Sequence, residues 1–146
     1  MRVATRYSIG VHIMTLLASE HGAERCSESI AQSIGVNPVV VRTIISKLRK
    51  AGLLATRQGV AGAMLELPAD KITLLDIYKA IEDSPEIFGL HEKTDTKCPV
   101  GNCIQPALQE VFCEARRAME ARLGQTTLAE FIRDLEQRAA LAMASR

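Results

Sequence analysis

Residues 34–53 read IGVNPVVVRTIISKLRKAGL, and this stretch contains the best-delimited helix of the chain. Asn37 is a favoured N-cap residue, and Pro38 suits the first helical position, where its missing N–H costs nothing. Gly52 ends the pattern. The apolar residues between them recur at the i, i+3, i+4 and i+7 spacing of one helix face: Val41, Ile44, Ile45 and Leu48. We therefore predict an amphipathic helix that begins near Asn37.

A second, shorter helix is expected just before this one. Ser27 is a suitable N-cap, and Gly35 ends the helix because glycine adopts the left-handed conformation freely. Two helices joined by a tight Gly-containing turn are typical of a helix-turn-helix unit. The stretches 53–56 and 63–67 read as two strands joined by a basic, Gly-rich tip, which indicates a β-hairpin wing. With a first helix over about 2–19, the predicted fold class is a mainly α winged helix-turn-helix domain.

The C-terminal half adds helices beyond the winged domain. Thr73 and Asp76 form a capping box, which predicts a helix to about Glu82. Residues 83–104 contain several Pro and Gly and are expected to be irregular, whereas a long helix is expected over Pro106–Leu123. We divide the chain into a winged DNA-binding domain over 1–82, a sensor loop over 83–104 and dimerisation helices over 105–146. A long amphipathic helix needs a partner, and we expect a second copy, the alternative being that it folds back on its own domain.

Charge is unevenly distributed along the chain, although the net charge is only +1. Residues 1–66 contain eight Lys and Arg and four Glu, whereas residues 67–146 contain ten Lys and Arg and thirteen Asp and Glu. No acidic residue lies between Glu28 and Glu66. A basic island of this kind favours a DNA-binding surface, with a solvated helix face as the alternative. No stretch is long and apolar enough to span a membrane, so the protein is expected to be cytoplasmic, with reduced cysteines.

The expected contacts with double-stranded DNA follow from the geometry of the helix-turn-helix. The start of the second helix reads base edges, and polar or basic residues around it hold phosphates. Arg42 is suited to a bidentate pair with guanine, and Val40 to the methyl group of thymine. The wing glycines allow close approach to the minor groove. The residues expected to bind DNA are Ser27, Asn37, Pro38, Val39, Val40, Arg42, Thr43, Ser46, Lys47, Arg49, Arg57, Gln58, Gly59 and Gly62.

Several segments resemble one family of regulators. They are residues 34–42, 48–53, 59–62 (GVAG) and 72–77 (ITLLDI). In this order they resemble the Rrf-two (BadM-type) family of winged helix-turn-helix transcriptional regulators, and residues 98–105 resemble its YwnA-like branch. The resemblance implies a homodimer held by the long helix and a palindromic operator. The expected function is that of a transcriptional repressor rather than an enzyme, since no catalytic constellation stands out.

Four cysteines are the candidate sensor residues: Cys26, Cys98, Cys103 and Cys113. A redox or electrophile switch is the first hypothesis, because Arg116 and Arg117 lie within one helical turn of Cys113 and favour its thiolate. The family resemblance implies a second hypothesis, in which the last three thiols ligate a [2Fe–2S] cluster with His12 as the fourth ligand. Their spacing, C-x4-C-x9-C, departs from the cluster-binding pattern of the family. Incidental cysteines are the third alternative, and a small redox or metal carrier without DNA binding is the alternative from another class.

Overall fold

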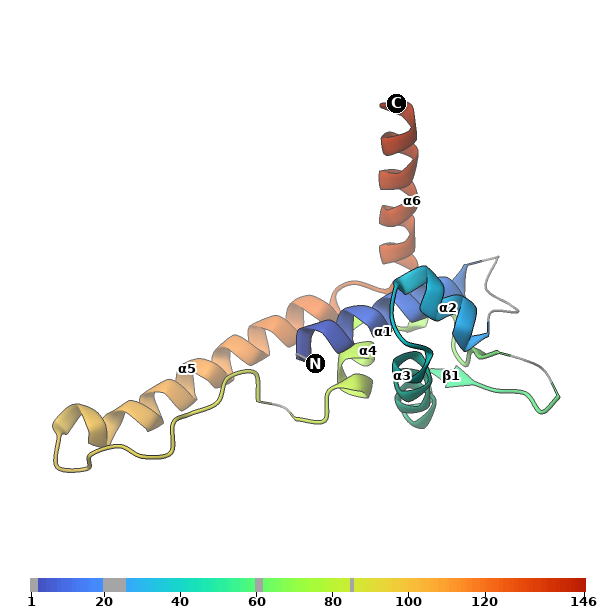
Figure 1. Cartoon of the computed structure of the whole chain (residues 1–146). Coiled ribbons are helices and arrows are strands. Elements are labelled where there is room, and N and C mark those ends of the chain that lie inside the picture. The colour runs from blue at the N-terminus through green and yellow to red at the C-terminus, as the bar shows by residue number, and fades with distance from the viewer. Residues whose placement is uncertain (1–2, 20–25, 60–61, 85) are drawn as a thin grey trace.

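The computed structural model describes residues 3–19, 26–59, 62–84 and 86–146 and is mainly helical (Figure 1). Its elements in chain order are α1 (Val3–Ala18), α2 (Ser27–Ile34), α3 (Pro38–Lys50), β1 (Leu54–Ala55), β2 (Met64–Leu65), η1 (Ala69–Lys71), α4 (Leu74–Ile81), α5 (Pro99–Gly124) and α6 (Leu128–Ala144). The predicted fold class, a mainly α chain with a small wing, is confirmed. Within the described ranges, no helix is long and apolar enough to cross a membrane.

One hydrophobic core holds the N-terminal helices and the wing together. Its centre is α1, which lies against α2, α3, α4 and β2. Gly10 allows α1 to approach α4 closely, because a Cβ at this position would lie 1.9 Å from Cδ1 of Ile81. The largest fully buried side chains are Ile13, Met14, Ile30, Val41, Ile44, Leu48, Ile72, Ile77, Ile81 and Leu128. Each contributes about 1.5–3 kcal/mol relative to exposure, so this core fixes the position of α3.

The helix-turn-helix unit forms as the sequence predicts, with one correction. The Asn37 side chain accepts a hydrogen bond from the Val39 N–H at 2.9 Å and so caps α3. Gly35 ends α2 with a φ of 80°, in the region that favours glycine. The N-cap of α2 is Cys26 rather than Ser27, because the backbone is extended at Cys26 and already helical at Ser27.

The wing has shorter strands than the sequence predicts. β1 and β2 pair antiparallel over two residues each, with Leu54 opposite Leu65. The expected strands over 53–56 and 63–67 are reduced to these residues because only the base of the hairpin packs on the core. Leu54 is buried there, whereas residues 56–59 are exposed. Val60 and Ala61 of the wing tip lie outside the described residues.

Two capping boxes lie side by side and join α4 to α6. In each box the threonine Oγ1 accepts from a backbone N–H and the acidic side chain accepts from the threonine N–H; the pairs are Thr73 with Asp76 and Thr127 with Glu130. Thr73 and Thr127 form an antiparallel bridge. The Leu128 N–H donates to the carbonyl of Ile72 at 2.7 Å. The sequence predicts the box of Thr73, but not its pairing with the box of Thr127 more than fifty residues further along the chain.

The long helix α5 begins earlier than expected. It spans 26 residues, about 39 Å at the standard rise, and starts at Pro99 instead of Pro106. Both prolines suit a first helical position. Pro99 occupies the first position of α5, and Pro106 lies inside the helix. The irregular segment expected over 83–104 therefore ends at Cys98.

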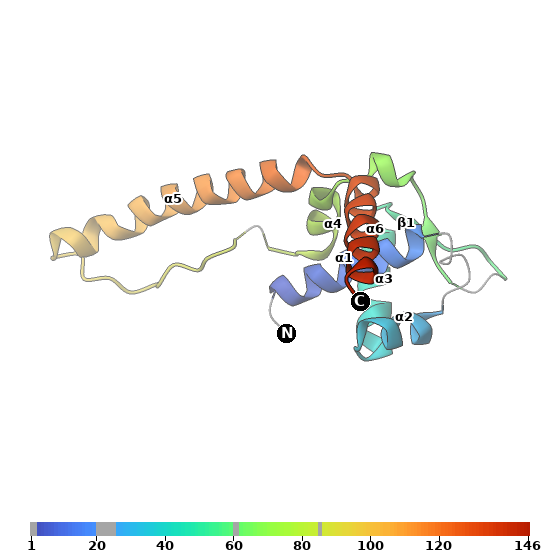
Figure 2. The ribbon, with the colours of Figure 1, turned by 90° about the horizontal axis from the view of Figure 1, so that it is seen from above.

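The two C-terminal helices project away from the winged domain in different directions. Figures 1 and 2 show α5 extending to one side, with the preceding segment running alongside it to its distal end. The rings of Phe88 and Phe112 lie against each other with centroids 5.0 Å apart. Gln105 donates a side-chain hydrogen bond to the carbonyl of His91. These contacts hold the segment on α5, and none of the α5 residues is buried.

Candidate nucleic-acid interface

The start of α3 presents an uncovered face. Val39 is 60% exposed, and Arg42 and Thr43 are also exposed. Thr43 Oγ1 donates to the carbonyl of Val39 at 2.9 Å, a bond that satisfies the hydroxyl within the helix. Val40 is half-buried against the core, so less of its side chain is available to a thymine methyl group than expected. The exposed face therefore centres on Val39 and Arg42.

Arg42 forms an ion pair that the sequence did not indicate. Its Nη2 donates to Oε1 of Glu28 on α2, and both side chains are more than half exposed. The pKa of Glu28 is lowered, first by a hydrogen bond from its own backbone N–H and then by Cys26 and Arg42. A guanidinium has five N–H donors, so Arg42 retains donors for a base edge while Glu28 holds one of them.

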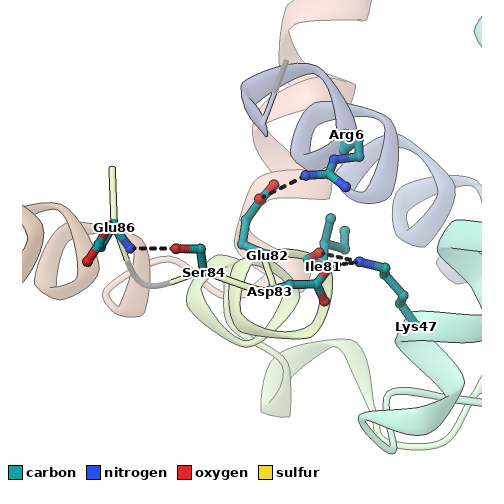
Figure 3. Close-up of polar contacts among 7 residues, drawn as sticks. All are labelled: Arg6, Lys47, Ile81, Glu82, Asp83, Ser84 and Glu86. Atoms are coloured by element: carbon teal, nitrogen blue, oxygen red, sulfur yellow. Dashed lines mark hydrogen bonds and ion pairs between the residues drawn. The ribbon is translucent and has the colours of Figure 1, made fainter. Parts of the chain in front are cut away.

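Lys47 lies in a different environment from the phosphate contact expected of it. Its ammonium group donates to the carbonyl of Ile81 at 3.1 Å and to Oδ2 of Asp83 at 2.5 Å (Figure 3). The side chain is 24% exposed. The hydrogen bond from Lys47 is the main cause that lowers the pKa of Asp83. In the free protein Lys47 therefore bridges α3 to the C-terminal end of α4.

A second polar contact lies beside this bridge. Arg6 of α1 and Glu82 approach to 3.7 Å, and the Glu82 side chain is only 2% exposed. Burial raises the pKa of Glu82, an effect that Arg6 and Lys47 oppose. Figure 3 shows the Lys47 and Arg6 contacts on successive residues at the end of α4. The junction between α4 and the following segment is thus tied to both α1 and α3.

The wing and the start of α2 border the same part of the domain. A groove of about 310 Å³ lies between them, lined by Cys26, Ser27, Glu28, Ile45, Thr56, Gly62 and Ala63. Arg49, Arg57, Gln58 and Gly59 are exposed, whereas Ser27, Pro38 and Ser46 are half-buried. Gly59 and Gly62 have φ values of 81° and 96°, in the range that other residues rarely adopt. These positions stay predictions as DNA contacts.

The cysteines do not converge within one chain. All four are free, and only Cys113 is partly buried, with Gln109 Nε2 3.8 Å from its Sγ. The rise of an α-helix places Cys103 and Cys113 about 15 Å apart along α5. In the parts of the chain that the structure describes, no three or more His, Cys, Asp or Glu are close enough to hold a metal ion.

These positions therefore do not fit a [2Fe–2S] cluster whose ligands all come from one chain. The cluster hypothesis needs Cys98, Cys103 and Cys113 close together, but the last two are ten residues apart on one continuous helix. His12 lies on α1 and lines a groove of about 490 Å³ that also includes Phe131 and Leu135 of α6. Cys26 is distant in sequence and forms the N-cap of α2.

Cys98 has the clearest chemical activation among the cysteines of the described residues. It is the exposed N-cap of α5, and the backbone N–H groups of Gly101 and Val100 in the first turn lower the pKa of its thiol. Gly101 allows this turn to form, because a Cβ there would lie 2.2 Å from the carbonyl oxygen of Asp95. The Cys-Pro-Val-Gly motif therefore builds a thiolate-stabilising helix start.

We predict that Gly101→Ala raises the pKa of Cys98 toward the ordinary value for a thiol. The added Cβ must displace the Asp95 carbonyl, and this shift moves the two N–H groups away from the sulfur. The measurement is the rate of Cys98 alkylation as a function of pH, followed by mass spectrometry of the labelled peptide. Gly89→Ala is the matched control, since its Cβ meets nothing within 4 Å. Equal midpoints in Gly101→Ala and the wild type would contradict the prediction.

An uncovered helix start, a helix packed behind it and an adjoining hairpin wing define a winged helix-turn-helix protein. The family model for Rrf2, described as an iron-dependent transcriptional regulator, matches residues 3–134. The chain belongs to the Rrf2 family, a family of DNA-binding transcriptional regulators rather than enzymes.

Individual relatives agree with this assignment. YwnA of Bacillus subtilis (strain 168), a candidate HTH-type transcriptional regulator, is 41% identical over 133 residues, which cover 91% of this chain and 98% of YwnA. A crystal structure of a candidate DNA-binding protein matches with a TM-score of 0.72 and 39% identity, covering 87% of this chain and 98% of that one. CymR, the global cysteine regulator of B. subtilis, matches with a TM-score of 0.66 and 27% identity, covering 90% and 96%.

Proposed function

We propose that the protein is a homodimeric repressor that reads a palindromic operator with α3 and responds to chemistry at its cysteines. The observation that carries the DNA contact is the exposed first half of α3, with Val39 uncovered and Arg42 oriented by Glu28. The wing of the same domain supplies Arg57 and two glycines with positive φ, Gly59 and Gly62. Arg42 reads a base edge in this proposal, and the wing holds the backbone.

The dimer is proposed to form along α5. The apolar residues of this helix divide into two groups: Leu108, Phe112 and Met119 are half-buried, while others are exposed. The α5 stripe is made of residues that recur every three or four positions: Val100, Ile104, Ala107, Val111, Ala115 and Ala118, all exposed except the half-buried Ile104. Val100 is 68% exposed and Val111 58%. A projecting helix with such a stripe matches the contact surface of a helix pair.

The helix α6 supports the same proposal. It projects from the domain in Figures 1 and 2, and its Leu141 and Met143 are 69% and 79% exposed. The largely apolar groove between α1 and α6 adds further uncovered surface beside it. Apolar surface on this scale favours association, and two-fold symmetry would duplicate every contact.

Thiol chemistry is the proposed signal. Cys98 is exposed at the distal end of α5 and has a stabilised thiolate, the form that reacts with oxidants and electrophiles. CymR, a relative with the same fold, is a cysteine regulator, which supports sulfur chemistry as the class of signal. A cluster held with donors from a second copy is the other candidate. Visible absorption by anaerobically purified protein would favour that cluster over the simple thiol switch.

The function is tested by selecting bound fragments from a sheared genomic library with the purified full-length protein. We expect enrichment of sequences with two-fold symmetry, upstream of genes, and tight binding of the selected duplex in a mobility-shift assay. A scrambled duplex of the same composition is the control. Failure to enrich any sequence, or equal binding of both duplexes at moderate salt, would reject the proposal. A reporter gene behind the selected operator then measures whether binding represses transcription.

A further inference from the structure

We infer that Lys47 is a positioning residue for the recognition helix, and that its contact with Asp83, just beyond the end of α4, supports operator affinity. This inference rests on the proposed DNA-binding function. Lys47 belongs to α3, Ile81 is the last residue of α4, and Asp83 lies two residues beyond it. Figure 3 shows the Lys47 side chain directed at both partners.

The geometry favours positioning over a phosphate contact. Two of the three ammonium donors of Lys47 are used, at 3.1 Å to the Ile81 carbonyl and at 2.5 Å to Asp83. The carbonyl belongs to the C-terminal turn of α4, where the helix dipole attracts a cation. With only 24% of its side chain exposed, Lys47 has little reach toward a phosphate.

The contact acts on the part of α3 that sets its orientation. Ile44 and Leu48, on either side of Lys47 in sequence, are buried in the core, so the middle of α3 rests on the domain. Lys47 adds a polar tie from this region to α4, and α3 and α4 lie against each other. Loss of the tie would leave the buried face in place while removing one restraint on the angle of the helix.

Asp83 places the contact with Lys47 at the start of the segment that leads from α4 to Cys98. It lies next to Glu82, which pairs with Arg6, and next to Ser84, whose Oγ accepts from the Glu86 N–H at 3.2 Å. The chain then runs along α5 to Cys98 (Figures 1 and 2).

Asp83→Asn gives a test in which the sign of the effect is decisive. Asp83 is 77% exposed, so the substitution leaves the core intact. If only charge matters, removing an anion near DNA strengthens binding to every duplex. If Asp83 positions α3 through Lys47, Asp83→Asn instead weakens binding to the selected operator, by roughly two- to thirtyfold, the range for residues that modulate coupling without touching the ligand. Binding to the scrambled duplex is not weakened.

Lys47→Met and the double variant complete a double-mutant cycle. Lys47→Met keeps the apolar stem and removes the charge, and we expect an operator-specific loss at least as large as that of Asp83→Asn. The double variant should bind like Lys47→Met, because both substitutions break the same contact. The dependence of affinity on salt should keep its wild-type slope in all three variants.

Matched controls separate the tie from general charge effects. Glu86→Gln removes one negative charge three residues beyond Asp83, from a carboxylate in no ion pair among the described residues. Lys50→Met makes the Lys47 substitution at an exposed position of the same helix. Neither control should lower the ratio of operator to scrambled affinity. Thermal unfolding curves of all variants establish that each is folded during the binding measurement.

Several results would overturn the inference. Tighter binding of Asp83→Asn to both duplexes would show that Asp83 acts through charge alone. A loss in Lys47→Met that is equal on both duplexes, with a salt slope lower by about 0.9, would make Lys47 a phosphate contact. Unchanged operator binding in either variant would also refute it. Failure of the wild type to bind any selected duplex would instead reject the proposed function, so the two failures are distinguishable.

Discussion

Val111→Glu is expected to convert the protein to a monomer and to lower operator affinity by at least about a hundredfold, since a second linked site raises overall affinity by about 10²–10⁴. Val111 is 58% exposed near the middle of the α5 stripe. In a two-fold symmetric dimer each substitution appears twice across the interface, so two carboxylates would enter an apolar contact. The winged domain does not depend on this side chain, and the monomer should keep its helical content.

Sedimentation velocity measures the oligomeric state of Val111→Glu, and titration of a labelled operator measures its affinity. Asn102→Glu is the control, because it adds the same charge to an exposed position on the opposite side of α5 from Val111. The control should remain a dimer and bind the operator as the wild type does. A dimeric Val111→Glu protein with normal affinity would exclude the α5 stripe as the interface.

Arg42→Ala is expected to weaken operator binding by roughly five- to 150-fold, the range for loss of one bidentate pair with a base. Its ion pair with Glu28 is exposed on both sides, and exposed pairs contribute little to stability. The variant should therefore unfold near the wild-type temperature. Specificity at one base pair of each half-site should relax, because the guanidinium no longer selects its partner base.

Competition with operators changed at single positions measures that relaxation. Arg49→Ala is the control, since Arg49 is exposed on the last turn of the same helix, where a cation is suited to the backbone. It should weaken the operator and the scrambled duplex alike. If Arg42→Ala produces the same uniform loss, Arg42 contacts phosphate and the base-reading residue lies elsewhere on α3.

The local structure around α3 follows from short-range sequence rules. Asn37 caps the helix and Gly35 closes the preceding turn, because both positions require backbone geometries that few residue types favour. The same holds for the capping box of Thr73 and Asp76, which involves atoms only three residues apart. Patterns of this kind are readable because the interacting groups lie within one helical turn.

The start of α5 was less predictable because two prolines satisfy the same local rule. Pro99 and Pro106 each suit a first helical position, and the intervening residues contain no decisive stop. The choice involves contacts along the preceding segment, such as the ring contact of Phe88 with Phe112 and the turn in which Asp95 lies against Gly101. The position of the thiols follows from that choice, since a helical Cys103 cannot move toward Cys113.

The sequence by itself determined the class of fold and the limits of α3, and it predicts the residues of a DNA-binding surface. It could not assign the role of Lys47, whose positive charge and place on α3 suited a phosphate contact. Its observed partners, Ile81 and Asp83, lie more than thirty residues further along the chain. The pairing of Glu28 with Arg42 was likewise not predictable from the sequence. Only the tertiary structure decides such roles, because the free energy of a charged side chain depends on which groups the fold brings near it and not on its neighbours in sequence.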